Sequence, residues 1–234
     1  MSAPARGERL IVALDVPSAG EARALVERLG DAVAFYKVGL ELFAAGEGFA
    51  LVDWLAGRGH KVFADLKLYD IPETVRRAVA NLRGRGITFL TVHGERAIMQ
   101  AAAQEKGATK ILAVTVLTSL GPEDLAQMGY RGSVQDLVMQ RARGAAEAGC
   151  DGVICSGLEA AALKAEFGPR LLRVTPGIRP AGAEAGDQKR TVEVAQAFAN
   201  GADYIVVGRP VRDAPDPRQA AASIQRTIAS IFPA

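Results

Sequence analysis

The chain has 234 residues, of which 49% are apolar, and its 28 basic and 26 acidic residues leave a net charge of +2. This near balance argues against a nucleic-acid partner or a membrane surface, both of which call for a basic patch. No apolar run approaches the length that spans a bilayer, and residues 1–9 lack the apolar segment of a secretory signal. Cys150 and Cys155 are expected to be small buried residues rather than a disulfide, and with two histidines they form no zinc-type cluster. We therefore expect a soluble, cytoplasmic protein.

Apolar runs that are typical of buried strands alternate with helical patterns along the whole chain. The runs fall at 10–15, 33–39, 62–64, 87–94, 111–116, 152–155, 171–175 and 204–207. Helical patterns follow them at 22–29, 42–56, 73–83, up to about 106, 121–128 with 134–148, 158–166, 191–200, and finally up to about 231. Eight strand–helix units of this size predict a (β/α)8 TIM barrel, with residues 1–234 as a single domain. The alternative is an open doubly wound sheet, but no Gly-x-Gly-x-x-Gly follows the first strand.

The most informative stretch is 61–74, Lys-Val-Phe-Ala-Asp-Leu-Lys-Leu-Tyr-Asp-Ile-Pro-Glu-Thr. It begins as a buried strand and ends at a helix start, where Pro72 suits the first helical turn. Asp65 and Lys67 are two residues apart, so both side chains are expected on one face at the end of the strand. Asp70 follows in the turn. Charges are rarely buried without a partner, so these residues form either a structural ion pair at the barrel mouth or a catalytic group.

Polar residues recur where the other predicted strands end, and in barrels of this class the active site lies at that end. They are Asp15, Lys37, His93, Thr118 with Ser119, Thr175, and Gly208 with Arg209. Taken singly, Asp15 or Lys37 could be a rim charge paired across the barrel, and His93 could be a packing residue. Their repetition at one end of successive strands favours a shared site.

A phosphate site is expected beside the loops after the seventh and eighth strands. The first loop, 176–190, has no periodicity and carries Arg179 and Gln188, and the second carries Gly208 and Arg209. Glycine lets backbone N–H groups approach a phosphate, and arginine offers two charge-assisted hydrogen bonds. A solvated loop with ordinary surface charges is the other interpretation of 176–190. A loop of this length inside a compact barrel is more often functional.

The segment Asp65-Leu-Lys-Leu-Tyr-Asp70-Ile-Pro-Glu-Thr74 resembles the signature of the orotidine 5′-phosphate decarboxylase family. The resemblance extends over nearly the whole chain. It includes the segments 13–15, 37–39, 91–94, 116–119, 151–156, 175–179, 186–190 and 207–210. One departure is Val192, near which the family commonly has a proline.

The resemblance implies a metal-free and cofactor-free decarboxylation of orotidine 5′-monophosphate to UMP by a homodimer. It assigns the ribose hydroxyls to Asp15 and Lys37, and the reacting carbon to Asp65, Lys67 and Asp70, with Lys67 as the proton donor to C6. It places Asp70 and Thr74 in the site of the partner subunit. It assigns the pyrimidine and ribose side to Thr118 and Ser119, and the phosphate to Arg179, Gln188, Gly208 and Arg209.

Two other functions are compatible with parts of this pattern. Sugar-phosphate decarboxylases and synthases share Asp-x-Lys-x-x-Asp, but they hold magnesium with a carboxylate at the end of the second strand. This chain has Lys37 there, a cation that should repel a metal. A non-catalytic phosphate-binding barrel would have no need for Lys67 between two aspartates.

Overall fold

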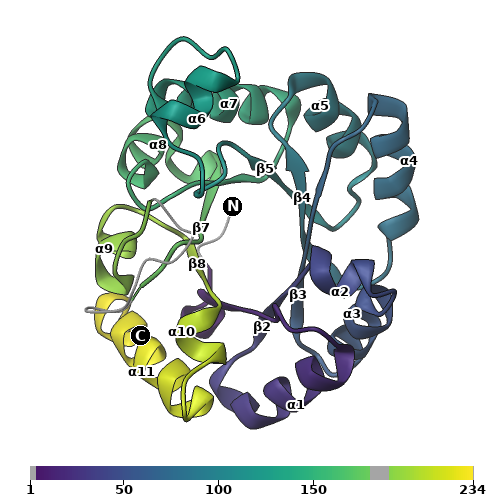
Figure 1. Ribbon diagram of the computed structural model, residues 1–234, viewed down its shortest axis with the longest axis vertical. Helices are drawn as coiled ribbons and strands as arrows, with labels where there is room; N and C mark the ends of the chain where they lie inside the picture. The colour runs from purple at the N-terminus through teal and green to yellow at the C-terminus, as the bar shows by residue number, and fades with distance from the viewer. Residues whose placement is uncertain (1–3, 180–189, 234) are drawn as a thin grey trace.

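The structure, a computed structural model, describes residues 4–179 and 190–233. Within these residues, eight parallel strands close into a barrel in sequence order (Figure 1). The strands are β1 (Leu10–Ala13), β2 (Phe35–Gly39), β3 (Lys61–Leu68), β4 (Ile87–His93), β5 (Lys110–Val114), β6 (Gly152–Ile154), β7 (Leu172–Thr175) and β8 (Tyr204–Val207). The barrel closes where β8 pairs with β1, with Ile205 opposite Leu10. The predicted (β/α)8 barrel is confirmed.

The helices form a ring outside the strands (Figure 1). They are α1 (Ala19–Leu29), α2 (Leu40–Ala44), α3 (Gly48–Gly57), α4 (Pro72–Leu82), α5 (Arg96–Glu105), α6 (Pro122–Gln127), α7 (Val134–Ala148), α8 (Ala160–Phe167), α9 (Val194–Ala199), α10 (Arg209–Arg212) and α11 (Pro217–Ile231). Short 3-10 turns occupy Arg6–Glu8, Gly30–Ala32 and Gly168–Arg170. None of the helices in the described ranges is long and apolar enough to cross a membrane.

Several expected helices differ in extent from the observed ones; α1, for example, begins at Ala19 rather than at residue 22. The helix predicted over 42–56 is split into α2 and α3, because Gly46 takes a left-handed conformation with φ of 80°. The helix expected from 191 begins only at Val194. Val192 instead forms an isolated parallel bridge with Ile178, so the chain returning from the loop after β7 is extended at this point.

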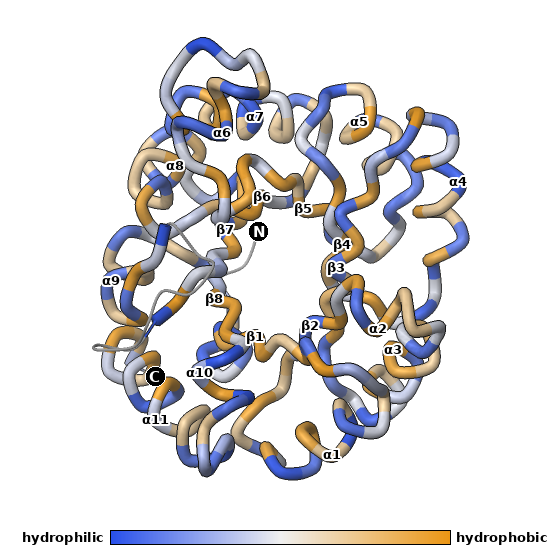
Figure 2. The backbone as a smooth tube through the Cα atoms, viewed as in Figure 1, coloured by the Kyte–Doolittle hydropathy of each residue, from blue (hydrophilic) through white to orange (hydrophobic). Residues whose placement is uncertain are grey.

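The core has two parts. One lies between the strands and the helices, and the other fills the barrel interior. In the interior, Phe35, Phe89 and Tyr204 pack ring against ring, with centroids 5.0 Å apart for Phe35–Phe89 and for Phe89–Tyr204. Figure 2 shows the strands as the most continuously apolar part of the backbone. Cys150 and Cys155 are buried and unpaired, as expected. The packed interior closes the barrel and leaves its C-terminal mouth as the place for polar side chains.

Candidate active site

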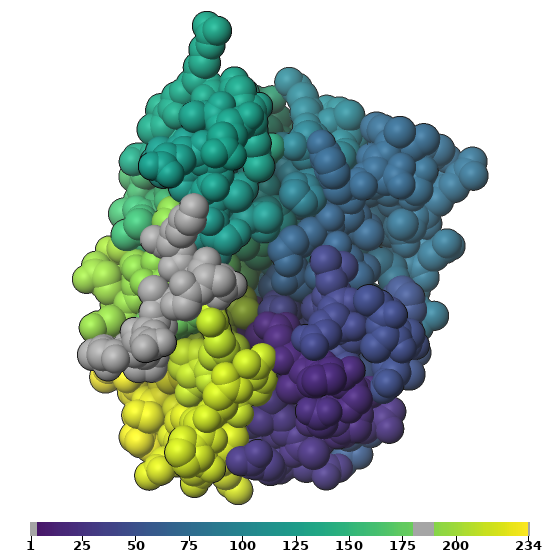
Figure 3. All heavy atoms as spheres, in the orientation of Figure 1, coloured from purple at the N-terminus to yellow at the C-terminus, as the bar shows by residue number. Residues whose placement is uncertain are grey.

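A cavity of about 520 Å³ opens at the C-terminal ends of the strands. The face seen in Figure 3 is hollowed near its centre, between segments from both halves of the chain. The cavity is lined by Ala13, Asp15, Lys37, Phe63, Asp65, Lys67, Leu117, Thr118, Ser119, Ile154, Pro176, Gly177, Arg179, Val206, Gly208, Arg209 and Arg212. The structure therefore brings most of the predicted site residues into one cavity.

Four charged side chains form a continuous chain of alternating sign along one wall. Lys37 Nζ lies 2.8 Å from Asp15 Oδ1 and 3.6 Å from Asp65 Oδ2. Lys67 Nζ lies 2.8 Å from the same Asp65 Oδ2. Asp65 is thus shared by two ammonium groups, both of which reach the cavity.

Among the described contacts, this row of charges begins at Asp15 and ends at Lys67. The Asp70 side chain accepts a hydrogen bond from the N–H of Ile71 at 2.6 Å.

The backbone at Lys67 is unusual and explains where its side chain points. Lys67 has φ of 47°, in the left-handed region that side chains other than glycine seldom adopt, and the β3–β4 register shifts between Ala64 and Leu68. Thr91 on β4 stabilises this conformation: its hydroxyl accepts from the Lys67 N–H at 2.9 Å and donates to Asp65 Oδ1 at 2.9 Å. Strained backbone of this kind persists where the surrounding structure fixes it, as at active sites.

Electrostatic interactions keep Lys37 and Asp65, the two buried members of this row of charges, in their charged forms. Burial alone would lower the pKa of Lys37, but the attraction of Asp65 and Asp15 outweighs it and raises the pKa above the ordinary value. Burial alone would raise the pKa of Asp65, but Lys37 and Lys67, with hydrogen bonds from Lys67 and Thr91, lower it. The site therefore offers fixed charges at neutral pH.

The part of the cavity lining that follows β7 and β8 combines glycines with cations. Pro176, Gly177 and Arg179 follow β7, and Gly208 and Arg209 follow β8. Gly177 has φ of 77°, which favours glycine at this position. Gln188, the remaining predicted phosphate residue, lies outside the described residues.

Thr118 and Ser119 form the tip of a turn that follows β5. The Leu120 N–H donates to the Leu117 carbonyl at 2.9 Å, which closes the turn around them. Both residues line the cavity between the lysines and the segment after β7. The turn therefore presents both residues to the cavity.

Four residues that the sequence analysis singled out lie outside the cavity lining. Thr175 is fully buried at the end of β7. Asp70 and Thr74 are exposed at the rim, Asp70 before α4 and Thr74 in its first turn. His93 is half-buried and packs against Tyr69, with ring centroids 4.7 Å apart. Desolvation lowers the pKa of His93, which suits a neutral packing histidine.

Sequence reasoning gave no role to three residues that shape this site. Thr91 lies in an apolar strand pattern, so its two hydrogen bonds could not be read from composition. Arg212 lines the cavity one helical turn after Gly208, and its guanidinium donates to the Asp15 carbonyl. Gly39 leaves room for the ion pair, since a Cβ there would lie 3.1 Å from Lys37 Nζ and 3.2 Å from Asp15 Oδ1. For Gly39, its position directly after Lys37 and Val38 at the end of the strand was the only sequence feature that could have suggested a role.

Comparisons with known proteins agree with this geometry. The family described as orotidine 5′-phosphate decarboxylase / HUMPS matches residues 8–224. A protein of Methylococcus capsulatus named orotidine 5′-phosphate decarboxylase is 60% identical over 228 residues, which cover 97% of this chain and 94% of the relative. A Rhodopseudomonas palustris protein of the same name is 56% identical, with 97% of each chain covered.

Solved structures agree with the sequence relatives. The orotidine 5′-phosphate decarboxylase of Lactobacillus acidophilus matches with a TM-score of 0.84 and 36% identity, over 94% of this chain and 99% of that one. The enzyme of that name from Pyrococcus horikoshii matches with a TM-score of 0.75 and 28% identity, over 94% and 98% of the two chains. The extent of these matches and the arrangement of the cavity together lead to one conclusion: the chain belongs to the orotidine 5′-phosphate decarboxylase / HUMPS family.

Proposed function

We propose that this chain decarboxylates orotidine 5′-monophosphate to UMP, the last step of de novo pyrimidine synthesis, and does so in the cytoplasm without a metal or a cofactor. The observation that carries the proposal is the position of Lys37, between Asp15 at 2.8 Å and Asp65 at 3.6 Å. The Lys37 ammonium, at the end of the second strand, would repel a magnesium ion there. It also completes a set of charges suited to a reaction that forms a carbanion.

The chemistry follows from the position of Lys67. When the bond between C6 and the carboxylate breaks, carbon dioxide leaves and the electron pair stays on C6. The Lys67 ammonium, held 2.8 Å from Asp65, stabilises that charge and then gives its proton to C6. The neutral amine regains a proton from solvent, and Asp65 restores its orientation. Loss of carbon dioxide with gain of one proton balances the reaction.

The remaining cavity residues bind the parts of the nucleotide that do not react. Asp15 and Lys37 hold ribose hydroxyls, and the turn with Thr118 and Ser119 meets the pyrimidine. The phosphate lies beside Gly208 and is held by the side chains Arg179, Gln188 and Arg209. Binding energy from the phosphate, remote from C6, supports the chemical step by fixing the pyrimidine against Lys67.

We further propose that two chains form a homodimer in which Asp70 and Thr74 act in the partner's site. The segment that carries them is supported as an interface by its exposed apolar side chains: Tyr69 is 65% exposed and Ile71 67%. Large apolar side chains grouped on a surface indicate a contact with another protein. In the partner's site, Asp70 would face the substrate carboxylate beside Lys67, and repulsion there would favour departure of carbon dioxide.

The test is turnover of orotidine 5′-monophosphate by the purified protein, followed by the loss of its ultraviolet absorbance. We expect rapid turnover, with UMP and carbon dioxide formed in equal amounts. The opposite result would be a protein that leaves this nucleotide unchanged but converts a phosphorylated keto sugar acid in the presence of magnesium. That result would assign the chain to the sugar-phosphate decarboxylases and synthases instead.

A further inference from the structure

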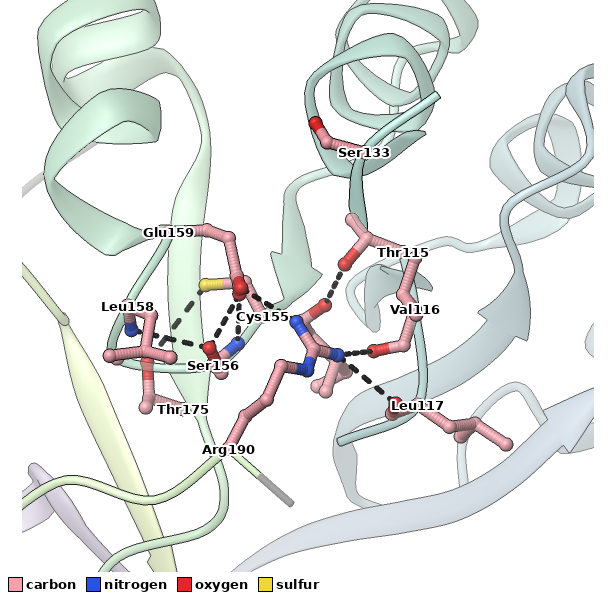
Figure 4. Close-up of polar contacts among 12 residues, drawn as sticks. Thr115, Val116, Leu117, Ser133, Cys155, Ser156, Leu158, Glu159, Thr175 and Arg190 are labelled. Atoms are coloured by element: carbon pink, nitrogen blue, oxygen red, sulfur yellow. Dashed lines mark hydrogen bonds and ion pairs between the residues drawn. The ribbon is translucent and has the colours of Figure 1, made fainter. Parts of the chain in front are cut away.

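A second buried polar network lies beside the cavity and is not part of the chain of catalytic charges (Figure 4). Its centre is the ion pair of Arg190 and Glu159, which are only 8% and 5% exposed. Arg190 Nη1 donates to Glu159 Oε1 at 2.6 Å. The other terminal nitrogen, Nη2, donates to the backbone carbonyls of Val116 at 2.9 Å and Leu117 at 3.0 Å. One guanidinium thus joins the chain segments that follow β5 and β6.

Glu159 is itself fixed to the turn between β6 and α8. Its Oε2 accepts from the Ser156 N–H at 2.9 Å and from the Ser156 hydroxyl at 2.6 Å. The Ser156 hydroxyl in turn accepts from the Leu158 N–H at 3.2 Å. Because both carboxylate oxygens have partners, Glu159 gives Arg190 a rigid anchor.

The two carbonyls that Arg190 holds lead directly into the turn with Thr118 and Ser119. The Leu117 carbonyl accepts twice, from the Leu120 N–H that closes the turn at 2.9 Å and from Arg190 at 3.0 Å. The Thr115 carbonyl, which directly precedes that of Val116, accepts a hydrogen bond from Arg141 on α7. Arginine side chains therefore hold three consecutive carbonyls of the segment that presents the turn to the cavity.

We infer that Arg190 is a positioning residue for the nucleotide: anchored by Glu159, it holds the turn that presents Thr118 and Ser119 to the pyrimidine. This inference rests on the proposed function. A planar guanidinium can serve a carboxylate and two carbonyls at once, whereas the single point charge of lysine cannot match that geometry. The buried Nε of Arg190 has no hydrogen-bond partner. The guanidinium is therefore oriented for its contacts with Glu159 and the two carbonyls, although one of its own donors stays unpaired.

A second buried arginine, at the other end of the barrel, provides a control that distinguishes a positioning role from simple structural support. Arg173 on β7 is 5% exposed, lies 2.7 Å from Asp203, and donates to the carbonyls of Gly201, Gly168 and Leu171 at 2.6, 2.7 and 3.0 Å. It has the same kinds of partner as Arg190, but the carbonyls it holds are not part of the turn that lines the cavity. Arg173→Lys is therefore the control for loss of a buried arginine.

The experiment is a double-mutant cycle with Arg190→Lys, Ser119→Ala and the double variant. Each protein is measured for kcat and KM with orotidine 5′-monophosphate, for its Kd for UMP by calorimetry, and for Tm. We expect Arg190→Lys to lower kcat/KM by about 10- to 100-fold, since misplacement of a binding group by about 1 Å costs that much. Ser119→Ala should add less than about twofold to this loss, because the turn is already displaced. Arg173→Lys should lower Tm and leave kcat/KM unchanged below the unfolding range.

The inference would be overturned if the loss in kcat/KM of the double variant equalled the product of the losses of the two single variants. An Arg190→Lys enzyme with wild-type kcat/KM would overturn it as well. If the wild-type chain turns over no orotidine 5′-monophosphate, the proposed function fails, and the same cycle measured on UMP affinity still decides the role of Arg190. If Arg190→Lys does not fold, Arg190→Gln combined with Glu159→Gln removes both charges together and takes its place in the cycle.

Discussion

Replacing Asp65 by asparagine isolates the charge on which the arrangement of the site depends. The amide keeps the shape of the side chain, and its oxygen can still accept the hydrogen bond that Thr91 gives at 2.9 Å. The change removes the negative charge that lies 3.6 Å from Lys37 Nζ and 2.8 Å from Lys67 Nζ. Lys37 retains Asp15, whereas Lys67 loses the carboxylate that orients it.

The size of the effect follows from these distances. At an effective dielectric constant of about 20, the two contacts contribute roughly 5 and 6 kcal/mol of gross attraction. The cost of burying the Asp65 carboxylate offsets much of this, and Lys67 is 28% exposed and can turn towards water. We therefore expect Asp65→Asn to lower the free energy of unfolding by about 2–4 kcal/mol at pH 7. Activity should fall at least about 100-fold, because the proton donor is no longer held in place.

The pH dependence provides a second check of the same change. The folded pKa of Asp65 is lowered, so its stabilising effect is fully present above the unfolded value of about 3.9 and is lost as the pH falls through the lower folded pKa. The difference in stability between the wild type and Asp65→Asn should thus be constant from pH 7 to pH 5 and shrink below about pH 4.

Urea unfolding at several pH values measures both quantities. The control is Asp53→Asn, which removes an exposed partner 3.0 Å from Arg85 and should cost less than about 1 kcal/mol. The reasoning would be refuted if Asp65→Asn were as stable as the Asp53 control, or if the stability difference grew as the pH fell from 5 to 3.

Three further predictions test other parts of the account. Arg209→Ala should lower kcat/KM at least about 100-fold for the nucleotide and change it little for the phosphate-free nucleoside, and equal losses for both would contradict a phosphate contact. Exhaustive dialysis against a chelator should leave turnover unchanged, whereas activity that disappears and returns with magnesium would contradict the metal-free reaction. Mixing the inactive variants Lys67→Ala and Asp70→Ala should restore about a quarter of the sites, because random exchange makes about half the dimers mixed and each mixed dimer has one intact site. Verified mixed dimers that remain inactive would exclude the shared site.

The barrel and the main residues of its mouth could be predicted because their signals are local. An apolar run that ends in a charge marks both a buried strand and the C-terminal edge on which the charge lies. This reasoning placed Asp15, Lys37, Asp65 and Lys67 together, and the structure confirms their proximity. The break between α2 and α3 at Gly46 was missed, since the surrounding helical pattern continues through it.

The residues that support the site could not be predicted, because their roles depend on contacts between distant parts of the chain. Thr91 approaches Asp65 only through the shifted pairing of β3 with β4. Arg190 meets carbonyls more than 70 residues away in sequence. The trans role of Asp70 stays a prediction, since it concerns a second chain.

The central claim, that Lys67 protonates C6 in a decarboxylation of orotidine 5′-monophosphate, is tested most directly by comparing the wild type with Lys67→Ala. Both proteins are assayed with the nucleotide in deuterated water, and their UMP affinity and Tm are measured alongside. The account predicts that the wild type forms UMP with one deuterium at C6, while Lys67→Ala folds and binds UMP but has lost at least about 1,000-fold in kcat. A folded Lys67→Ala enzyme with near wild-type turnover would contradict it.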